Sequence, residues 1–348
     1  MGIRIAEIAR RAGVSRSTAS RVLAGRADEC RISKTTQEKI LTLAREAGYS
    51  AAGEETGRGG LIGVIVSDLS NLFFGKMAAS VVRLAHEAGF QAIVADSGGS
   101  QDREEEAVGM LLGCGAAGLL IAPIQRRRHH LRKLVRRRIP FVLVDRYFEG
   151  LASDCVVCDT KLGAMDLVKY LAGRGHSRIA YIGGPAGSFA DRARLDGYKK
   201  GLQESRLSFR AEYVFHHSFS AEGGRECAAK ILNLAHTPTA IVAANNEILV
   251  GVLSVLERIG LRRYREIAVG SFDEIPLLSA VNRPVAIVSQ PEEKMGEVAV
   301  ALLAERIAKP RTRYRRVVLA PALKIFGPGG RSSALPLGGA GPAKARGR

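Results

Sequence analysis

The spacing of apolar positions changes near residue 60 of the chain. Before that point apolar residues recur at helical spacing, so that Ile5, Ile8 and Ala9 share one helix face and 16–23 forms a second short helix. After it, short continuous apolar runs alternate with helical segments about every 25–30 residues, as in parallel sheets covered on both faces. The pattern predicts a small helical domain followed by a larger α/β part.

The predicted strands of the second part share an apolar run flanked by helical segments. They are Leu61–Val66, Phe90–Ala95, Gly118–Ala122, Phe141–Val144, Arg178–Gly183, Tyr213–His216, Thr239–Ala243 and Ile267–Gly270. Helices are predicted from about Gly75 to Ala88 and over Asp102–Leu112. About ten strands are too many for one comfortable sheet, which favours two βαβ subdomains with ligands beyond the carboxyl ends of the strands.

Two segments have a composition that opposes a packed core. Residues 49–60 contain four glycines and no apolar side chain larger than alanine after Tyr49, which is typical of a linker. Residues 327–348 are of low complexity, and we expect them to form a disordered basic tail.

The net charge of the chain indicates a class of binding partner. The 348 residues carry 52 Lys and Arg against 34 Asp and Glu, a formal charge of +18, which points to a polyanion such as nucleic acid. Residues 126–138 hold eight basic residues and 306–348 hold eleven, and neither segment holds an acidic one. We interpret the first as a solvated helix face and the second as a source of salt-dependent attraction to DNA.

Several classes of protein do not fit the sequence. No run approaches the ~18 apolar residues of a membrane helix, and the first residues lack a secretory apolar segment. The five scattered cysteines fit a reduced cytoplasm. We expect no membrane contact.

Chemical motifs of enzymes and metal sites are weak. Cys155 and Cys158 form a lone C-x-x-C inside an apolar run, which favours buried packing over redox or metal chemistry. The adjacent pairs His129-His130 and His216-His217 point in different directions on a helix or strand. We therefore expect no metal, no cofactor and no catalytic residue.

The N-terminal helices carry the strongest motif. Gly13 suits the left-handed turn that ends the first helix, and Ser15 suits the N-cap of the second. A third helix follows, capped at Ser33 or Thr35. Two short helices joined through glycine form a helix-turn-helix, whose second helix enters the major groove of DNA.

Side chains on the exposed face of this second helix have matching chemistry. We predict that Arg16, Ser17 and Arg21 read bases and that Ser15, Thr18 and Ser20 contact phosphates. The alternative is a small helical bundle with a solvated basic face.

The segment Ile5–Gly25 (IAEIARRAGVSRSTASRVLAG) resembles the DNA-binding signature of the LacI/GalR family of bacterial transcription regulators. The resemblance continues over nearly the whole chain, to about Ala322. Its further segments are Asp68–Phe74, Gly175–Gly183, Arg194–Tyr198, Ala243–Glu247 and Gly270–Glu274.

The resemblance implies an α/β architecture in which a helix-turn-helix domain over 1–48 and the linker 49–60 precede a periplasmic-binding-protein-like core over 61–326. That core would have two doubly wound parallel-sheet subdomains joined by crossings near 160, 290 and 318. Subdomain N would span about 61–159 and 291–318, and subdomain C about 160–290 and 319–326. Family members are dimeric, bind operator DNA and respond to a small effector in the interdomain cleft, so we expect a homodimeric repressor.

Candidate effector ligands follow predicted strands or lie at helix starts. Asp145-Arg146, Asn245, Asp273 and Gln290 follow strands, and Arg194 is predicted to open a helix. Phe73, Phe74 and Phe219 can supply an aromatic face, so the set suits a polyhydroxylated ligand such as a sugar. By the resemblance, six of these match family pocket positions: Asp145, Arg194, Phe219, Asn245, Asp273 and Gln290.

Other interpretations of these residues stay open. The phenylalanines could be core residues, Asp273 and Arg194 could form a structural salt bridge, and a purine could stack on Phe219. The chain also has Asn245-Asn246 and Asp273-Glu274 where the family usually has Asn-Asp and Asp-Asp. In function, the alternatives are a sugar- or nucleobase-binding protein, or a cleft enzyme, without specific DNA binding.

The linker departs from the family. It has no proline, no leucine before Leu61, and Glu54-Glu55 instead of the usual hinge helix. Glycine disfavours helix and carboxylates repel the minor groove, so we predict no intercalating hinge helix over 50–60. We expect coupling from cleft to DNA to be weaker or differently routed.

Overall fold

A computed structural model describes residues 5–23, 27, 30, 32–46, 60–259, 266–276, 278, 281, 283–327 and 332–335. The linker 49–59 and most of the segment 327–348 lie outside these residues, so the predicted absence of a hinge helix stays a prediction. Among the described helices, none is long and apolar enough to span a membrane.

The N-terminal domain contains three helices around a small core. They are α1 Ile5–Ala12, α2 Arg16–Leu23 and α3 Lys34–Glu46. Gly13 has a φ of +72° in the turn after α1, which a residue with a Cβ adopts only at a cost. Ile8, Ala19 and Ile40 are almost fully buried where the three helices meet. The predicted helix-turn-helix is confirmed, with Ser33 rather than Thr35 accepting from the backbone of α3.

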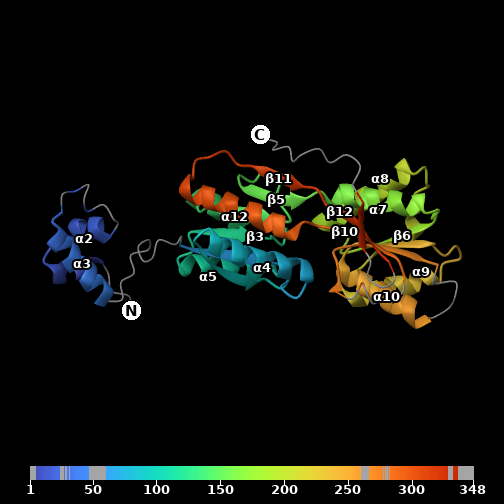
Figure 1. Ribbon diagram of the computed structural model, residues 1–348, viewed down its shortest axis with the longest axis horizontal. Helices are drawn as coiled ribbons and strands as arrows, with labels where there is room; N and C mark the ends of the chain where they lie inside the picture. The colour runs from blue at the N-terminus through green and yellow to red at the C-terminus, as the bar shows by residue number, and fades with distance from the viewer. Residues whose placement is uncertain are drawn as a thin grey trace.

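The rest of the chain forms two sheets, each with helices on both faces (Figure 1). The first sheet comprises β1 Leu61–Val66, β2 Gln91–Asp96, β3 Gly118–Ile121, β4 Phe141–Val144, β5 Asp154–Cys158 and β11 Arg316–Leu319. Its helices are α4 Leu72–Glu87, α5 Gln101–Gly113, α6 His129–Arg137 and α12 Glu292–Ala308. Apolar side chains of α4 and α12 pack on one face, and those of α5 and α6 pack on the other.

The second sheet repeats this plan. Its strands are β6 Ile179–Gly183, β7 Val214–His216, β8 Ala240–Ala243, β9 Ala268–Phe272, β10 Val285–Ser289, β12 Ala322–Phe326 and β13 Ser332–Leu335. Its helices are α7 Thr160–Gly173, α8 Phe189–Glu204, α9 Ala221–Leu232 and α10 Asn246–Ile259, with the short 3-10 helix η1 Ala211–Tyr213. Helices α7 and α8 lie on one face and α9 and α10 on the other (Figure 1).

Strand order explains where a ligand can bind. The first sheet is ordered β11-β5-β4-β3-β1-β2 and is parallel throughout. The second is ordered β13-β12-β10-β9-β8-β6-β7 and is parallel except at β12 and β13. The order reverses between β3 and β1 and between β8 and β6, which creates a crevice beyond the carboxyl ends of those strands.

Comparison with the sequence confirms the fold class. Continuous apolar runs such as Leu61–Val66 form fully buried parallel strands, as predicted. The predicted helix start at Gly75 is wrong, because the Asn71 side chain accepts from Phe73 N at 3.0 Å and α4 begins at Leu72. The disordered tail predicted over 327–348 is wrong for Ser332–Leu335, whose backbone pairs with β12.

The two cysteines of the C-x-x-C lie in different cores. Cys155 is buried beneath α5 and α6, and Cys158 packs against the core beneath α4 and α12. Both are free thiols, and burial raises the pKa of the Cys155 thiol to about 12. The preferred interpretation of buried packing is confirmed for Cys155, since a thiol of this kind is a poor nucleophile and metal ligand.

A buried ion pair holds the start of β5 to the end of α12. Asp154 is fully buried, and its Oδ2 accepts from Arg306 Nε at 2.8 Å. Its Oδ1 accepts from the backbone of Arg315 at 2.8 Å. Arg306 also donates to the carbonyls of Pro310 and Thr312, so the pair organises the whole turn into β11.

Removing one member of this pair is expected to destabilise the core strongly. Asp154→Asn leaves the Arg306 guanidinium buried without its counter-charge, which costs about 3–5 kcal/mol of unfolding free energy. Urea unfolding followed by circular dichroism measures this loss. The control is Glu297→Gln, which breaks the exposed Lys294–Glu297 pair and should cost below about 1 kcal/mol. Equal losses of unfolding free energy in the two variants would contradict the stabilising role of the Asp154–Arg306 pair.

Candidate functional site

Helix α2 presents a polar, basic face to solvent. Ser15 Oγ accepts from Thr18 N at 3.0 Å and caps the helix. Ala19, Val22 and Leu23 fix α2 to the core, which leaves the opposite face outward. The side chains of that face are exposed or half-buried: Ser15, Arg16, Ser17, Thr18, Ser20 and Arg21.

The basic side chains of α1 and α2 differ in their partners. Arg10 and Arg11 of α1 bind Glu7 at 2.6 and 3.1 Å, and these hydrogen bonds lower the pKa of Glu7. Arg16 and Arg21 contact no acidic group among the residues that the structure describes, so both guanidiniums are available to an external acceptor. Arg16 opens α2 and Arg21 lies in its last turn, and their base-reading role stays a prediction.

A cavity of about 880 Å³ lies between the two sheets at the carboxyl ends of their strands. It contains every side chain predicted as an effector ligand. These are Phe73, Phe74, Asp145, Arg146, Arg194, Phe219, Asn245, Asp273 and Gln290. The structure therefore brings the whole predicted set to one place, although their roles toward a ligand stay predictions.

Strained backbone marks equivalent positions on the two sides of this cleft. Asp145 follows β4 with a φ of 68°, and Asp273 follows β9 with a φ of 64°. Gln125, in the loop after β3, has a φ of 62°. Left-handed conformations of residues other than glycine are costly and gather at ligand sites, and here they point carboxylates into the cavity.

Arg194 is buried in the second turn of α8, which begins at Phe189, so the prediction that it opens a helix is wrong. Its Nη1 donates to the carbonyl of Ala244, and its guanidinium lies 4.3 Å from the centre of the Phe272 ring. No direct ion pair joins it to Asp273, although the charge of Arg194 acts to lower the pKa of that carboxyl group. Its Nε is buried without a hydrogen-bond partner.

Asp273 and Gln290 face Arg194 in the deepest part of the cleft. Gln290 Nε2 donates to Asp273 Oδ1 at 2.9 Å, while Gln290 Oε1 is buried without a partner. Burial raises the pKa of Asp273 to about 6, against the opposing effect of Arg194. The site thus holds a buried carboxyl group and two unsatisfied polar atoms.

The pKa of Asp273 makes stability depend on pH. Because its folded pKa exceeds the ordinary value of 3.8, its stabilising contribution is complete below about pH 4 and is lost as pH rises through 6. The isosteric Asp273→Asn variant should therefore gain up to about 3 kcal/mol relative to wild type between pH 4 and pH 7. Urea unfolding across this range measures the difference, with exposed Asp196→Asn as control. If the difference in unfolding free energy between the variant and wild type stayed the same across this pH range, the raised pKa of Asp273 would be contradicted.

Aromatic side chains cover one side of the cavity. Phe219 lies directly over Gly184, where a Cβ would stand 2.2 Å from its ring, so only glycine allows this contact. Phe73 and Phe74 are buried in the core of the first sheet, with ring centroids 5.0 Å apart, and also border the cavity. These two residues thus pack in the core and also line the cavity, and Phe219 is the aromatic residue best placed for a ligand.

Further lining residues were not predicted. They come from the loops after β1, β3 and β6 and from the start of α8: Ser67, Asp68, Asn71, Gln125, Arg126, Ser188, Phe189 and Arg192. The strand-end rule would have found Ser67 and Asp68, which follow the predicted strand Leu61–Val66. No sequence signal identifies Ser188 or Arg192.

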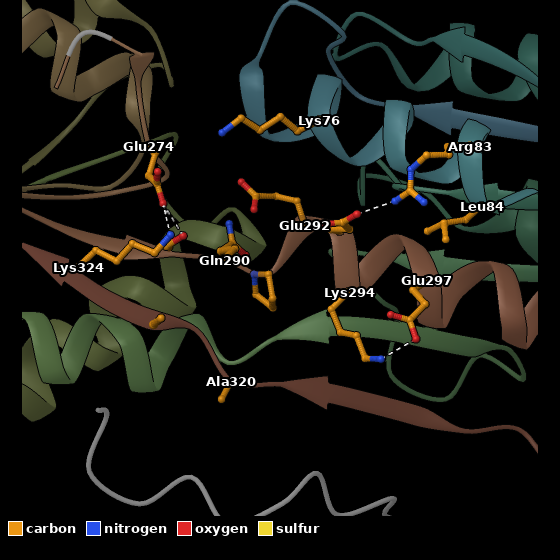
Figure 2. Close-up of a pocket in the computed structure, with 14 residues that line it drawn as sticks. Lys76, Arg83, Leu84, Glu274, Gln290, Glu292, Lys294, Glu297, Ala320 and Lys324 are labelled. Carbon is orange, nitrogen blue, oxygen red and sulfur yellow. Dashed lines mark hydrogen bonds and ion pairs between the residues drawn. The ribbon is translucent and has the colours of Figure 1, made fainter. Parts of the chain in front are cut away.

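The two subdomains also contact each other directly. Asn71 Nδ2 donates to Asn246 Oδ1 at 3.1 Å, from the N-cap of α4 to the start of α10. A second cavity of about 750 Å³ borders the crossing strands, and Figure 2 shows Lys76 and Glu292 reaching into it. Glu274 binds Lys324 at 2.6 Å there, and burial raises the pKa of Glu292.

Gln290 lines both cavities and immediately precedes the crossing into α12. A ligand that bonds Gln290 in the cleft would therefore act directly on the connection between the subdomains.

Comparison with known proteins identifies the family. Residues 4–51 match bacterial regulatory proteins of the lacI family, and residues 168–325 match the periplasmic binding protein-like domain. The chain is 28% identical over 319 residues to the ribose operon repressor of Haemophilus influenzae, covering 90% of this chain and 95% of the relative.

Two further relatives agree. The HTH-type transcriptional repressor PurR of Vibrio atlanticus is 28% identical over 320 residues, which cover 90% of this chain and 94% of PurR. A crystal structure from Burkholderia thailandensis, assigned as a ribose operon repressor, is 30% identical with a TM-score of 0.69 and covers 76% of this chain and 98% of its own. The chain therefore belongs to the lacI family of bacterial regulatory proteins and is a DNA-binding transcription regulator.

Proposed function

We propose that this regulator is a homodimeric, cytoplasmic repressor whose operator affinity changes when a sugar or sugar derivative binds in the interdomain cleft. Arg16, Ser17 and Arg21 read the operator bases, and Ser15, Thr18 and Ser20 contact the phosphates. The cleft ligands are the nine side chains named above. The protein binds its effector without converting it.

Unsatisfied polar atoms in the cleft carry this proposal. Arg194 Nε is a buried donor without a partner, and Gln290 Oε1 is a buried acceptor without one. Ser188 Oγ, which can donate and accept, is also buried without a hydrogen-bond partner among the described residues, and Ser188 lines the cavity. Leaving such groups unpaired costs about 1–3 kcal/mol each, so a ligand that pairs them gains that energy on binding. Hydroxyl groups, which donate and accept, match a mixture of this kind.

A purine is the second candidate, because Phe219 offers a flat ring at the cavity wall. Arg194 and Asp273 could bond a nucleobase edge, and one relative is the HTH-type transcriptional repressor PurR. The ribose operon names of two other relatives favour the sugar.

A thermal-shift screen over sugars, sugar acids and nucleobases tests the proposal. A cleft ligand at 100 times its Kd stabilises the fold by about 2.7 kcal/mol, which is readily seen as a higher melting temperature. We expect one sugar class to stabilise the protein and to be recovered unchanged. Stabilisation by nucleobases alone would favour the purine, turnover would favour an enzyme, and no stabilisation by any compound would contradict effector binding.

A further inference from the structure

A cluster of histidine and glutamate side chains lies behind the cleft, between α5 and α6. Glu105 comes from α5, and His129 and His130 are the first residues of α6. One donor atom from each lies within 4.8 Å of the others. Adjacent histidines were expected to point in different directions; their ring centroids lie 5.8 Å apart in an edge-on arrangement, and Glu105 approaches both rings.

The donor atoms have the spacing of a metal site. Glu105 Oε2 is 2.8 Å from His129 Nε2, and Glu105 Oε1 is 3.8 Å from His130 Nδ1. Tetrahedral zinc with bonds of about 2.0–2.2 Å holds neighbouring ligand atoms about 3.5 Å apart. The 2.8 Å contact is of hydrogen-bond length and involves the other oxygen of Glu105, so a bound metal would replace it. Glu105 Oε1 is buried and has no hydrogen-bond partner, so this acceptor is unsatisfied without a further ligand.

A buried carboxylate orients the inner histidine. Glu104 and His130 have side chains that are 0% and 5% exposed, and Glu104 Oε1 lies 2.6 Å from His130 Nε2. Because a carboxylate accepts, Nε2 must donate, which leaves Nδ1 as the ring nitrogen that faces Glu105, with Gln101 Nε2 also 3.5 Å from it. Carboxylate–histidine pairs of this kind commonly orient metal ligands.

Charges around the cluster determine which metal fits. Arg127, Arg128, Arg132 and Lys133 lie on the adjacent segment, although Arg127 binds Asp102 and Arg128 donates to the carbonyl of Glu149. These positive charges disfavour binding of a cation that is held mainly by electrostatic attraction, such as Ca²⁺ or Mg²⁺. Two imidazoles and one carboxylate are instead a donor set for zinc and related transition metals.

We propose that Glu105, His129 and His130 bind a divalent transition metal such as Zn²⁺, with Glu104 as the positioning residue. His129 is half-exposed, which leaves an entry path and room for a water molecule as the fourth ligand. Glu104 Oε2 also accepts from the backbone of Ile124 at 2.6 Å. Because Ile124 lines the cleft, bound metal would stiffen the cleft loop from behind.

Zinc counting on the full chain tests the site. Chelator-treated protein in a thiol-free reductant is dialysed against ZnCl2, and bound zinc is measured by atomic emission. We expect wild type to hold one equivalent more than His129→Ala or Glu105→Gln, and Glu104→Gln to weaken zinc binding about 10–100-fold. His129 is on the surface, so its variant should fold, and circular dichroism checks this.

Two control variants separate this site from adventitious zinc. His217→Ala removes a half-buried histidine of the other adjacent pair, which lies 3.5 Å from Glu226, and Cys114→Ser removes an exposed thiol. Both should keep the wild-type stoichiometry and the zinc-dependent rise in melting temperature. Equal zinc content in wild type, His129→Ala and Glu105→Gln would overturn the proposal, whatever ligand the cleft binds.

Discussion

Replacing Arg194 with alanine is expected to weaken effector binding at least about 100-fold, because the ligand loses charge-assisted hydrogen bonds worth about 1.5–3 kcal/mol each. Arg194 is buried, fixed by the Ala244 carbonyl and the Phe272 ring, and keeps one buried donor unsatisfied. Isothermal titration of the ligand found by thermal shift measures the loss.

The neighbouring Arg192 provides a matched control for this variant. It lies on the same helix, lines the cavity mouth and is exposed, so Arg192→Ala removes the same charge without removing a buried donor. We expect Arg192→Ala to retain affinity within about 10-fold. Similar losses in both variants would show that net charge, rather than the hydrogen bonds of Arg194, determines binding.

The second large effect concerns the operator. Replacing Arg16 or Arg21 with alanine should cost about 1–3 kcal/mol of operator binding each and relax the preference at the base that the side chain contacts. Both side chains are exposed and contact no acidic group among the described residues, so no internal interaction is lost with them. Binding to competitor DNA sequences should change little.

Arg10→Ala is the control for charge. Arg10 is exposed on α1 and binds Glu7, so this variant removes one positive charge outside the predicted reading face. Quantitative gel shift at two salt concentrations should show a small loss shared by all sequences. If Arg21→Ala behaved in the same way, Arg21 would be a phosphate contact rather than a base reader.

The fold could be predicted from sequence because its central strands are buried on both faces. Runs such as Phe141–Val144 have no polar position that could be confused with a half-exposed helix, and the structure places this strand at the predicted residues. Helix starts were less certain, because the Asn71 cap of α4 is a single polar residue among apolar ones. Strand β13 was missed, since its four residues lie among glycines and prolines.

Only those cleft residues that directly follow a strand could be predicted from the sequence. Asp145, Asn245, Asp273 and Gln290 follow recognisable strands, so their convergence follows from parallel topology. Ser188 and Arg192 enter through the loop and helix after β6, whose path depends on tertiary packing. The left-handed backbone of Asp145 and Asp273 was also beyond prediction, because aspartate adopts that conformation only when its surroundings enforce it.

The grouping of His129, His130 and Glu105 could not be predicted from the sequence. Sequence adjacency alone made His129-His130 a poor ligand pair, and the prediction of no metal site followed from it. The missing information was the position of α5, which brings Glu104 and Glu105 to the two rings from 24 or more residues away in the chain.

The central claim is that one chain reads DNA with α2 and senses a small molecule in the cleft. The most direct test is a gel shift with fragments of the source genome at physiological salt, with and without the ligand found by thermal shift. We expect a specific fragment to be retained, and we expect the ligand to change its affinity about 5–150-fold in wild type but not in Arg194→Ala. Failure to retain any specific fragment, with or without ligand, would contradict the central claim.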